Sequence, residues 1–517
     1  MSIAFSAAPE RAPMFRVSLI LEALRARPGL MFALAALAQG ALWTLVASLI
    51  YTAPPGDVPL VLAIGKEWQL GSPYGPPLAN WLADLSFRVA GDSIVGVYLL
   101  SQACVVATYW AVFALGRRIV GAAHAAMAIL LMTGISVFTV PTLDFGPAVL
   151  AMPLTAVTLL YGYRALADNR RLDWGLFGGA LGLLILTTYT GLFLFALIVL
   201  FMLVTERGRA RLMSLGPLAA LLVVVAINMP HILWLEKAGF DPLPALAAIP
   251  GLLVGEKHVM AWVNLLLFLV FSHAGLFVLA AVAGGVLAGP RVIAPAVERV
   301  PIEPFAKSYV YYFALAPLFL ATLLAVLLGR TAPVGGAAAI VIFSGLAVIV
   351  LAGDVIRLYR QRISALVWLG LLVVPPAVIV AATVTLPWTA AVDLEVSKPA
   401  NAMGQFFTET FRRRTGRPLA IVIGDQRTAG LVAFASPDRP SLYVDGNPAR
   451  SPWLNDGVVR QKGAIVTWPV TDAAGTPPAQ LKERFPDLVA EVPQSFDRMV
   501  QGRLQSLRIG WAMIRPK

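Results

Sequence analysis

Apolar segments about as long as membrane-spanning helices recur along this chain from Met31 to Trp388. A helix needs roughly 20 mostly apolar residues to cross a bilayer. On that window the pattern predicts about eleven spans, over residues 30–52, 93–115, 122–140, 143–163, 173–189, 190–205, 214–234, 259–288, 308–329, 333–353 and 365–386. The pair between Trp174 and Val204 allows two interpretations, because TTYTG (Thr187–Gly191) predicts a turn, whereas the apolar content also allows one long tilted helix.

The stretch between the first two apolar segments, residues 51–92, is too polar to span a membrane and too apolar and aromatic for a slack loop. It holds four carboxylates and two basic side chains, Asp57, Lys66, Glu67, Asp84, Arg88 and Asp92. We expect two short amphipathic helices broken by SPYGPP (Ser72–Pro77) and lying along the membrane surface.

The charges in the short loops predict the orientation of the chain, because cytoplasmic loops carry an excess of Lys and Arg. If the N-terminal segment 1–29 is cytoplasmic, the even-numbered spans end beside the strongly basic loops, at Arg117, Arg118, Arg164, Arg170, Arg171, Arg207, Arg209, Arg211, Arg291, Arg299, Arg357, Arg360 and Arg362. An odd number of spans then places the C-terminus outside the cytoplasm, which is the periplasm in a Gram-negative cell.

The pattern changes after Trp388, where charged residues and Pro/Gly punctuation replace the long apolar runs. Three short apolar runs predict strands: LAIVIGD (Leu419–Asp425), SLYVDG (Ser441–Gly446) and GAIVTW (Gly463–Trp468). The stretch MGQFFTETFRRR before them predicts a helix. We therefore expect an all-α polytopic membrane domain over residues 30–388, with its first outer loop at 53–92, and a small extracytoplasmic α/β domain over residues 389–517.

Composition supports a membrane protein and excludes other classes. Hydrophobic residues make up 58% of the 517 residues and charged residues 13%, whereas soluble domains carry about 25% charged residues. The formal charge of +12 follows from the basic loops, and no basic patch interleaved with aromatic residues indicates nucleic-acid binding. The single cysteine, Cys104, lies in an apolar segment, which excludes an intrachain disulfide and argues against a catalytic thiol.

Two features of the first outer loop carry a resemblance to a known family. An acidic residue, Asp57, follows the first span, and PPLANWL (Pro76–Leu82) comes about twenty residues later, just before the next span. This order resembles glycosyltransferase family 39 of the GT-C membrane glycosyltransferases, which includes protein O-mannosyltransferases and the lipid A aminoarabinose transferase. The resemblance implies a multi-pass enzyme of the bacterial inner membrane. It would transfer a sugar with inversion from a polyprenyl-phosphate-linked donor to lipid A, a polysaccharide, another lipid or a protein.

The same resemblance assigns roles to two carboxylates. Asp57 would be the general base that takes the proton from the acceptor nucleophile, although a carboxylate in this place is also common as a solvated helix cap. Asp144 would approach it from the junction of the third and fourth spans, and there it also suits a helix N-cap. The two carboxylates would either hold a divalent cation, Mg²⁺ or Mn²⁺, or divide base and binding roles. Many family members carry Asp-Glu where this chain has Asp57-Val58, which leaves the metal question open.

Other polar side chains are candidates for binding the donor's phosphate and sugar. Lys66 and Glu67 lie on the first predicted interfacial helix, where an anchored amphipathic surface is the commoner reason for such residues, and Tyr74 precedes the PPL element. Further candidate cations on the outer side are Lys237, Lys257, His258 and Arg330. Asp425 and Asp445 end predicted strands, where ligands often bind in α/β folds and where turn caps are also common. The four histidines do not form a metal-ligand spacing.

Two other functions are compatible with this pattern. A transporter or flippase would move a glycolipid without reacting it, but it usually carries charged residues in mid-membrane, and these spans are almost free of them. A scaffold whose function lies in the C-terminal domain is the second alternative.

Overall fold

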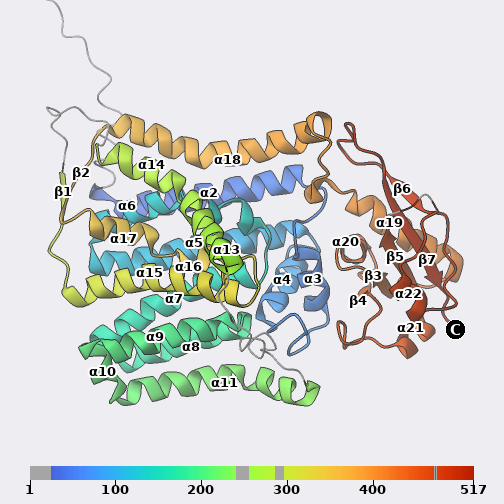
Figure 1. Ribbon diagram of the computed structural model, residues 1–517, viewed down its shortest axis with the longest axis horizontal. Coiled ribbons are helices and arrows are strands. Elements are labelled where there is room, and N and C mark those ends of the chain that lie inside the picture. The colour runs from blue at the N-terminus through green and yellow to red at the C-terminus, as the bar shows by residue number, and fades with distance from the viewer. Residues whose placement is uncertain (1–21, 23–24, 240–255, 286–295, 471, 473) are drawn as a thin grey trace, which may run out of the picture.

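The computed structural model describes residues 22, 25–239, 256–285, 296–470, 472 and 474–517. Long helices lie side by side in a bundle, and a small sheet covered by helices lies at one end of it (Figure 1). The prediction of a mostly helical membrane protein with a small C-terminal α/β part is confirmed.

Each predicted span is helical in the structure, but the helices differ in length. Among the described residues, six single helices are long and apolar enough to cross a membrane: α2 (Pro28–Ile50), α5 (Ile94–Ile119), α7 (Pro147–Asp168), α11 (Leu215–Ala238), α15 (Pro304–Leu327) and α18 (Gln361–Thr389). Three bent pairs raise the number to nine: α6 (Ala122–Met132) with the 3-10 turns η1 (Ser136–Phe138) and η2 (Val140–Leu143), α9 (Thr190–Val204) with α10 (Glu206–Leu212), and α13 (Glu256–Ser272) with α14 (Ala274–Ala283).

The two other predicted spans are shorter than a membrane-crossing helix. They are α8 (Arg171–Thr187), with 17 residues, and the consecutive short helices α16 (Ala337–Ile340) and α17 (Ser344–Leu351). The count of about eleven therefore stays a prediction, because apolar content does not reveal where a helix bends or stops. The alternative of one long helix between Trp174 and Val204 is wrong, since α8 ends at Thr187 and α9 begins at Thr190.

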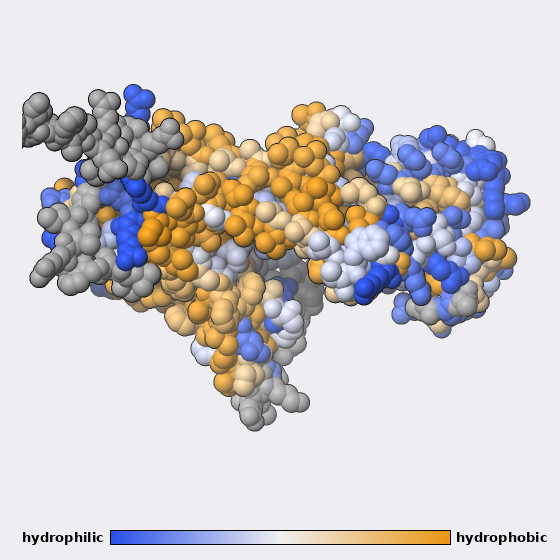
Figure 2. Space-filling view, turned by 90° about the horizontal axis from the view of Figure 1, so that it is seen from above, coloured by the Kyte–Doolittle hydropathy of each residue, from blue (hydrophilic) through white to orange (hydrophobic). Residues whose placement is uncertain are grey.

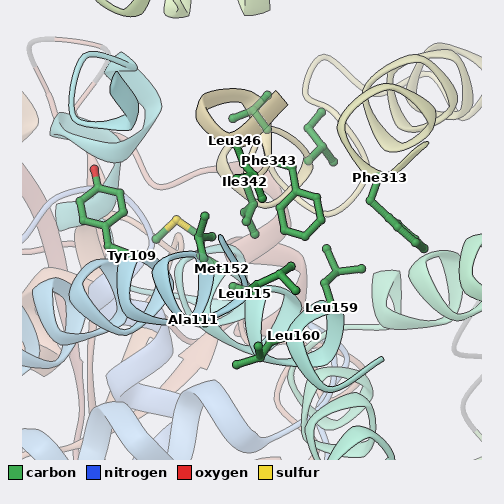
Figure 3. Packing of buried hydrophobic residues seen from close by; sticks show 14 of the residues in the cluster. Tyr109, Ala111, Leu115, Met152, Leu159, Leu160, Phe313, Ile342, Phe343 and Leu346 are labelled. Atoms are coloured by element: carbon green, nitrogen blue, oxygen red, sulfur yellow. The ribbon is translucent and has the colours of Figure 1, made fainter. Parts of the chain in front are cut away.

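The interior of the bundle is closely packed and largely apolar. Figure 3 shows side chains from α5, α7, α15 and the α16–α17 region meeting there, among them Leu115, Leu159, Phe313 and Phe343. On the face that Figure 2 shows, the surface of the bundle is also largely apolar, whereas the C-terminal end of the molecule is largely hydrophilic. Only 6% of the most apolar stretch of α18 is buried. An apolar interior within an apolar surface is the pattern expected of helices surrounded by lipid.

The C-terminal part is a five-stranded mixed sheet with strand order β4-β3-β5-β7-β6. Its strands are β3 (Ile421–Gly424), β4 (Ser441–Val444), β5 (Ala464–Pro469), β6 (Gln494–Phe496) and β7 (Leu507–Ile514). The three predicted strands are the parallel ones, and β6 and β7 add two antiparallel strands that the pattern did not predict. The connecting helices are α19 (Ala400–Thr415), α20 (Thr428–Ala435), α21 (Asp456–Lys462) and α22 (Ala479–Arg484), and a 3-10 turn, η4 (Glu395–Ser397), precedes them.

At the opposite end of the bundle, β1 (Ala296–Glu298) pairs antiparallel with β2 (Val355–Arg357). Figure 1 shows this ribbon and α10 far from the C-terminal sheet, and the first loop beside that sheet. The first loop and the C-terminal part therefore lie at the same end of the molecule.

The first loop forms the two predicted helices, α3 (Val58–Lys66) and α4 (Leu78–Val89). The helix α3 is enclosed on both sides instead of lying open along a surface. Its residues Leu60, Ala63 and Ile64 pack with α19 and α20, whereas Val58, Val61 and Leu62 pack into the bundle core. The loop therefore joins the bundle to the C-terminal part.

Candidate functional site

A tight turn between α2 and α3 places Asp57 directly in front of α3. The backbone N–H of Asp57 donates to Asp144 Oδ1 over 2.9 Å, and the backbone N–H of Val58 also hydrogen-bonds to this carboxylate. The first N–H groups of a helix have no partner within it, and they attract an anion. Asp144, which follows η2 on the neighbouring segment, therefore caps α3 from outside.

Gly56 makes this approach possible. Its φ is +51°, and a Cβ at this position would lie 2.1 Å from Asp144 Oδ2. Only glycine takes up this left-handed conformation at low cost and leaves room for the carboxylate. The breaker PPG (Pro54–Gly56) thus brings together the two acidic residues that the sequence suggested.

Asp144 is mostly buried, and the pKa of its carboxyl is raised to about 7. Burial is the main cause, and the charges of Asp57 and Glu395 act in the same direction. The two backbone N–H groups oppose the shift by stabilising the anion. Asp144 therefore changes charge close to neutral pH.

The side chain of Asp57 makes no capping hydrogen bond to α3. Instead, the carboxylate is exposed and its Oδ1 accepts a hydrogen bond of 3.0 Å from Gln426 Nε2. The cap interpretation of Asp57 therefore fails for its side chain, and its carboxylate stays accessible to a ligand.

A small crevice beside this turn is lined from both parts of the chain. Pro54 and Gly56 form one side, and Lys398, Gln426 and Arg427 form the other. Arg427 pairs with Glu395 over 2.6 Å and is largely exposed. The described cations that line this crevice, Lys398 and Arg427, therefore come from the C-terminal part. The sequence analysis missed them, because Gly424–Arg427 (GDQR) has the composition of an ordinary turn and nothing local links it to Asp57.

Lys66 and Glu67 lie at the contact between the first loop and the C-terminal part. Lys66 Nζ donates to the backbone carbonyl of Arg439, and burial lowers the pKa of Lys66. Arg439 also pairs with Asp84 over 2.6 Å, and the Asp84 side chain is fully buried. These contacts indicate that Lys66 helps to hold the first loop against the C-terminal part, and they leave it less suited to binding a phosphate. Glu67 Oε1 is buried without a hydrogen-bond partner among the described residues.

Tyr74 contacts the C-terminal part as well, where its hydroxyl hydrogen-bonds with Arg450. Arg450 forms an ion pair with Asp445. Asp425, at the end of β3, accepts hydrogen bonds from the backbone N–H groups of Arg427 and Thr428. Asp425 therefore caps α20.

The other candidate cations are not brought to Asp57 by any described contact. His258 is exposed on α13, Arg330 is exposed after α15, and Lys237 lies in the last turn of α11. The side chain of Lys257 lies outside the described residues.

The carboxylates fit a metal ion poorly. No group of three or more His, Cys, Asp or Glu side chains within the described residues could hold one. Asp144 directs its carboxylate at backbone N–H groups, which compete with a cation for the same oxygen.

Three comparisons with known proteins bear on this arrangement. The family model described as dolichyl-phosphate-mannose-protein mannosyltransferase matches residues 74–234. No curated protein matches the chain. Among solved structures, this chain is similar to ArnT from Cupriavidus metallidurans bound to undecaprenyl phosphate. The match covers 95% of this chain and 98% of the ArnT chain, with 13% identity and a TM-score of 0.60. The oligosaccharyltransferase of Archaeoglobus fulgidus, in complex with Zn and sulfate, matches 84% of this chain over 67% of its own, with 12% identity and a TM-score of 0.45.

The ArnT similarity shows that this chain has that overall fold, from the bundle to the C-terminal sheet. The family-model match begins within the first loop and runs to α11. Together they confirm the resemblance to the GT-C glycosyltransferases that the first loop suggested.

Proposed function

We propose that this protein is a glycosyltransferase that moves a sugar from a polyprenyl-phosphate carrier to a hydroxyl-bearing acceptor outside the cytoplasm, in a bacterial inner membrane. The observation that carries the proposal is the Asp57 turn. Asp144 and Gly56 fix its backbone, while the Asp57 carboxylate stays accessible. A carboxylate held in this way suits a general base.

Asp57 would take the proton of the acceptor hydroxyl as the acceptor oxygen attacks the anomeric carbon of the donor sugar. The bond between that carbon and the phosphate oxygen breaks, and polyprenyl phosphate leaves with the bonding electrons. One displacement inverts the anomeric configuration. Gln426 holds Oδ1 of the base through the hydrogen bond to its side chain and so orients the carboxylate.

The polyprenyl-phosphate donor is supported by the ArnT structure, which contains undecaprenyl phosphate. A phosphate needs positive partners, and Lys398 and Arg427 line the crevice beside Gly56. We assign them this role ahead of Lys66, whose ammonium group is bound to the Arg439 carbonyl. Asp144 would act mainly by shaping the turn.

The direct test is product analysis with purified protein in lipid nanodiscs. The protein is incubated with radiolabelled polyprenyl-phosphate sugars and a membrane-lipid extract, and glycosylated products are separated from the donor. Wild-type protein should form a new glycosidic product. Asp57→Asn should reduce turnover by about 10²–10⁴-fold while undecaprenyl phosphate binding is preserved.

Two results would contradict the proposal. Retention of more than about a tenth of the wild-type turnover by Asp57→Asn would remove Asp57 as the base. Movement of a labelled glycolipid across the bilayer without a new glycosidic bond would favour the flippase alternative. A divalent cation held by Asp57 and Asp144 stays a prediction, and transfer measured after EDTA treatment tests it.

A further inference from the structure

A cavity of about 370 Å³ lies between the bundle and the C-terminal part. Ligand pockets for small molecules typically measure about 300–1,000 Å³. One wall comes from the outer ends of α2 and α5, and the other from α19, Phe434 and Met499. Because α2 and α5 are long and apolar enough to cross a membrane, the cavity lies where the apolar bundle meets the hydrophilic end of the molecule.

The lining of this cavity carries no charged side chain. It consists of Tyr51, Thr52, Ala53, Pro54, Ile94, Tyr98, Pro399, Ala400, Asn401, Ala402, Phe434 and Met499. A phosphate or another ion would lose its hydration here without gaining a countercharge, which is unfavourable. The charged crevice with Lys398 and Arg427 is a neighbouring space, because Pro54 lines both.

The polar groups that line the cavity suit a neutral ligand with hydroxyl groups. Tyr98 is 1% exposed, and within the described part of the chain neither its hydroxyl nor that of Tyr51 forms a hydrogen bond. A buried phenol hydroxyl usually finds a partner. The two rings meet edge to face, with centroids 6.5 Å apart, and Asn401 lines the same space.

We infer that this cavity binds the acceptor, and that the acceptor is a neutral, hydroxyl-bearing lipid. The inference rests on the proposed transferase function. The hydroxyl-bearing head group would occupy the space beside Tyr51, Tyr98 and Asn401, while its acyl chains extend along the apolar surface of the bundle. The donor phosphate would lie in the charged crevice, so that donor and acceptor occupy two neighbouring spaces that share Pro54, close to the Asp57 turn.

The experiment measures lipid binding by native mass spectrometry of protein released from phosphatidylcholine nanodiscs. The probes are monoglucosyl diacylglycerol as the neutral lipid, phosphatidylglycerol as the anionic lipid, methyl glucoside as the free sugar, and undecaprenyl phosphate for the donor side. Wild-type protein should retain monoglucosyl diacylglycerol at least tenfold better than phosphatidylglycerol or methyl glucoside.

Three variants locate the binding. Ala402→Trp fills the cavity from an exposed position of α19 and should weaken monoglucosyl diacylglycerol binding by more than tenfold. Tyr98→Phe removes only a hydroxyl and should weaken it by about 3- to 10-fold, the effect of one hydrogen bond. Gln405→Trp places the same indole side chain at another exposed position of α19, outside the cavity, and should bind as wild type does.

Undecaprenyl phosphate binding checks that each variant is folded and separates the two proposals. If wild-type protein binds undecaprenyl phosphate but not monoglucosyl diacylglycerol, or if Ala402→Trp and Tyr98→Phe both bind the glycolipid normally, this inference is wrong and the transferase proposal stands. Equal binding of methyl glucoside would overturn the lipid acceptor in favour of a free sugar. If wild-type protein binds no undecaprenyl phosphate and forms no product, the transferase proposal itself fails.

Discussion

At the residue scale, the contact between Asp144 and Gly56 positions the Asp57 carboxylate, although neither Asp144 nor Gly56 would react itself. The Asp144 carboxylate occupies the space where a Gly56 side chain would be. It holds the backbone N–H of Asp57, while the Asp57 carboxylate points elsewhere, to Gln426. The position of the proposed base, Asp57, therefore depends on the preceding residue, Gly56, having no side chain.

Gly56→Ala tests this dependence. The added methyl group would displace the Asp144 carboxylate, and a misplacement of about 1 Å at a reacting group can cost about 100-fold in rate. Gly91→Ala is the matched control, because its φ is +73° and a Cβ there meets nothing within 4 Å. Both variants carry the left-handed strain, but only Gly56→Ala should lose transfer activity. Equal activity of the two variants in the product assay would show that Asp144 does not position Asp57.

The raised pKa of Asp144 predicts a pH-dependent stability. The folded protein holds this proton more tightly than the unfolded chain does, since the pKa rises from 3.8 to about 7. The contribution is therefore largest at low pH and is lost as the pH rises through that interval. Relative to Asp144→Asn, wild-type protein should lose on the order of 2–3 kcal/mol of stability between pH 5 and pH 8. Thermal unfolding of both proteins across that range measures it, and parallel curves would contradict the assignment.

At the element scale, α3 and α4 connect the bundle to the C-terminal part. The buried Asp84 of α4 binds Arg88 of its own helix and Arg439 of the C-terminal part, and it accepts a hydrogen bond from Trp68 Nε1. The Arg439 guanidinium also lies over the Phe87 ring, with 4.9 Å to the ring centroid. One arginine thus joins the two parts through both a buried charge and an aromatic face.

Arg439→Gln should loosen this joint. Asp84 would lose one of its charged partners while staying buried, which costs about 1–3 kcal/mol. Hydrogen exchange should then accelerate in α3, which both parts enclose in the wild-type protein. Arg414→Gln is the control, because it removes a partly exposed ion pair with Glu491 inside the C-terminal part, and exposed pairs contribute at most about 1 kcal/mol. Unchanged protection of α3 in Arg439→Gln would show that apolar packing alone holds the joint.

The apolar pattern predicted the elements well where each is one uninterrupted apolar run, as in α2, α5 and the parallel strands β3, β4 and β5. It predicted neither the sharp bends, such as the 88° bend after Met132, nor the strands β6 and β7. The contact between Gln426 and Asp57 spans 369 positions, so no local pattern could reveal it. Asp57 and Asp144 were accessible to prediction only through the family resemblance, and the different roles that we propose for them rest on the geometry.

At the scale of the whole molecule, the structure predicts the orientation of the chain in the membrane without a count of the spans. The first loop and the C-terminal part contact each other directly, so they lie on the same side of the membrane for any number of spans. Basic side chains gather at the other end of the bundle. Arg118 pairs with Asp168 where α5 and α7 end, Arg211 of α10 donates to the Leu166 carbonyl of α7, and Arg299 pairs with Asp354 beside the β1–β2 ribbon.

The positive-inside rule therefore predicts that the basic end faces the cytoplasm and that Asp57 and the C-terminal part face outward. Alkaline phosphatase fused after Lys517 should be active, whereas the same enzyme fused after Arg171, at the basic end, should be inactive although expressed.

A cysteine at the exposed Ala449 gives an independent readout, because the native Cys104 is buried. A membrane-impermeant maleimide should label Ala449→Cys in intact spheroplasts. An inactive, well-expressed fusion after Lys517 together with an unlabelled cysteine would reverse the orientation. The proposed base would then face the cytoplasm, where nucleotide sugars are available, and a polyprenyl-phosphate donor would no longer be required.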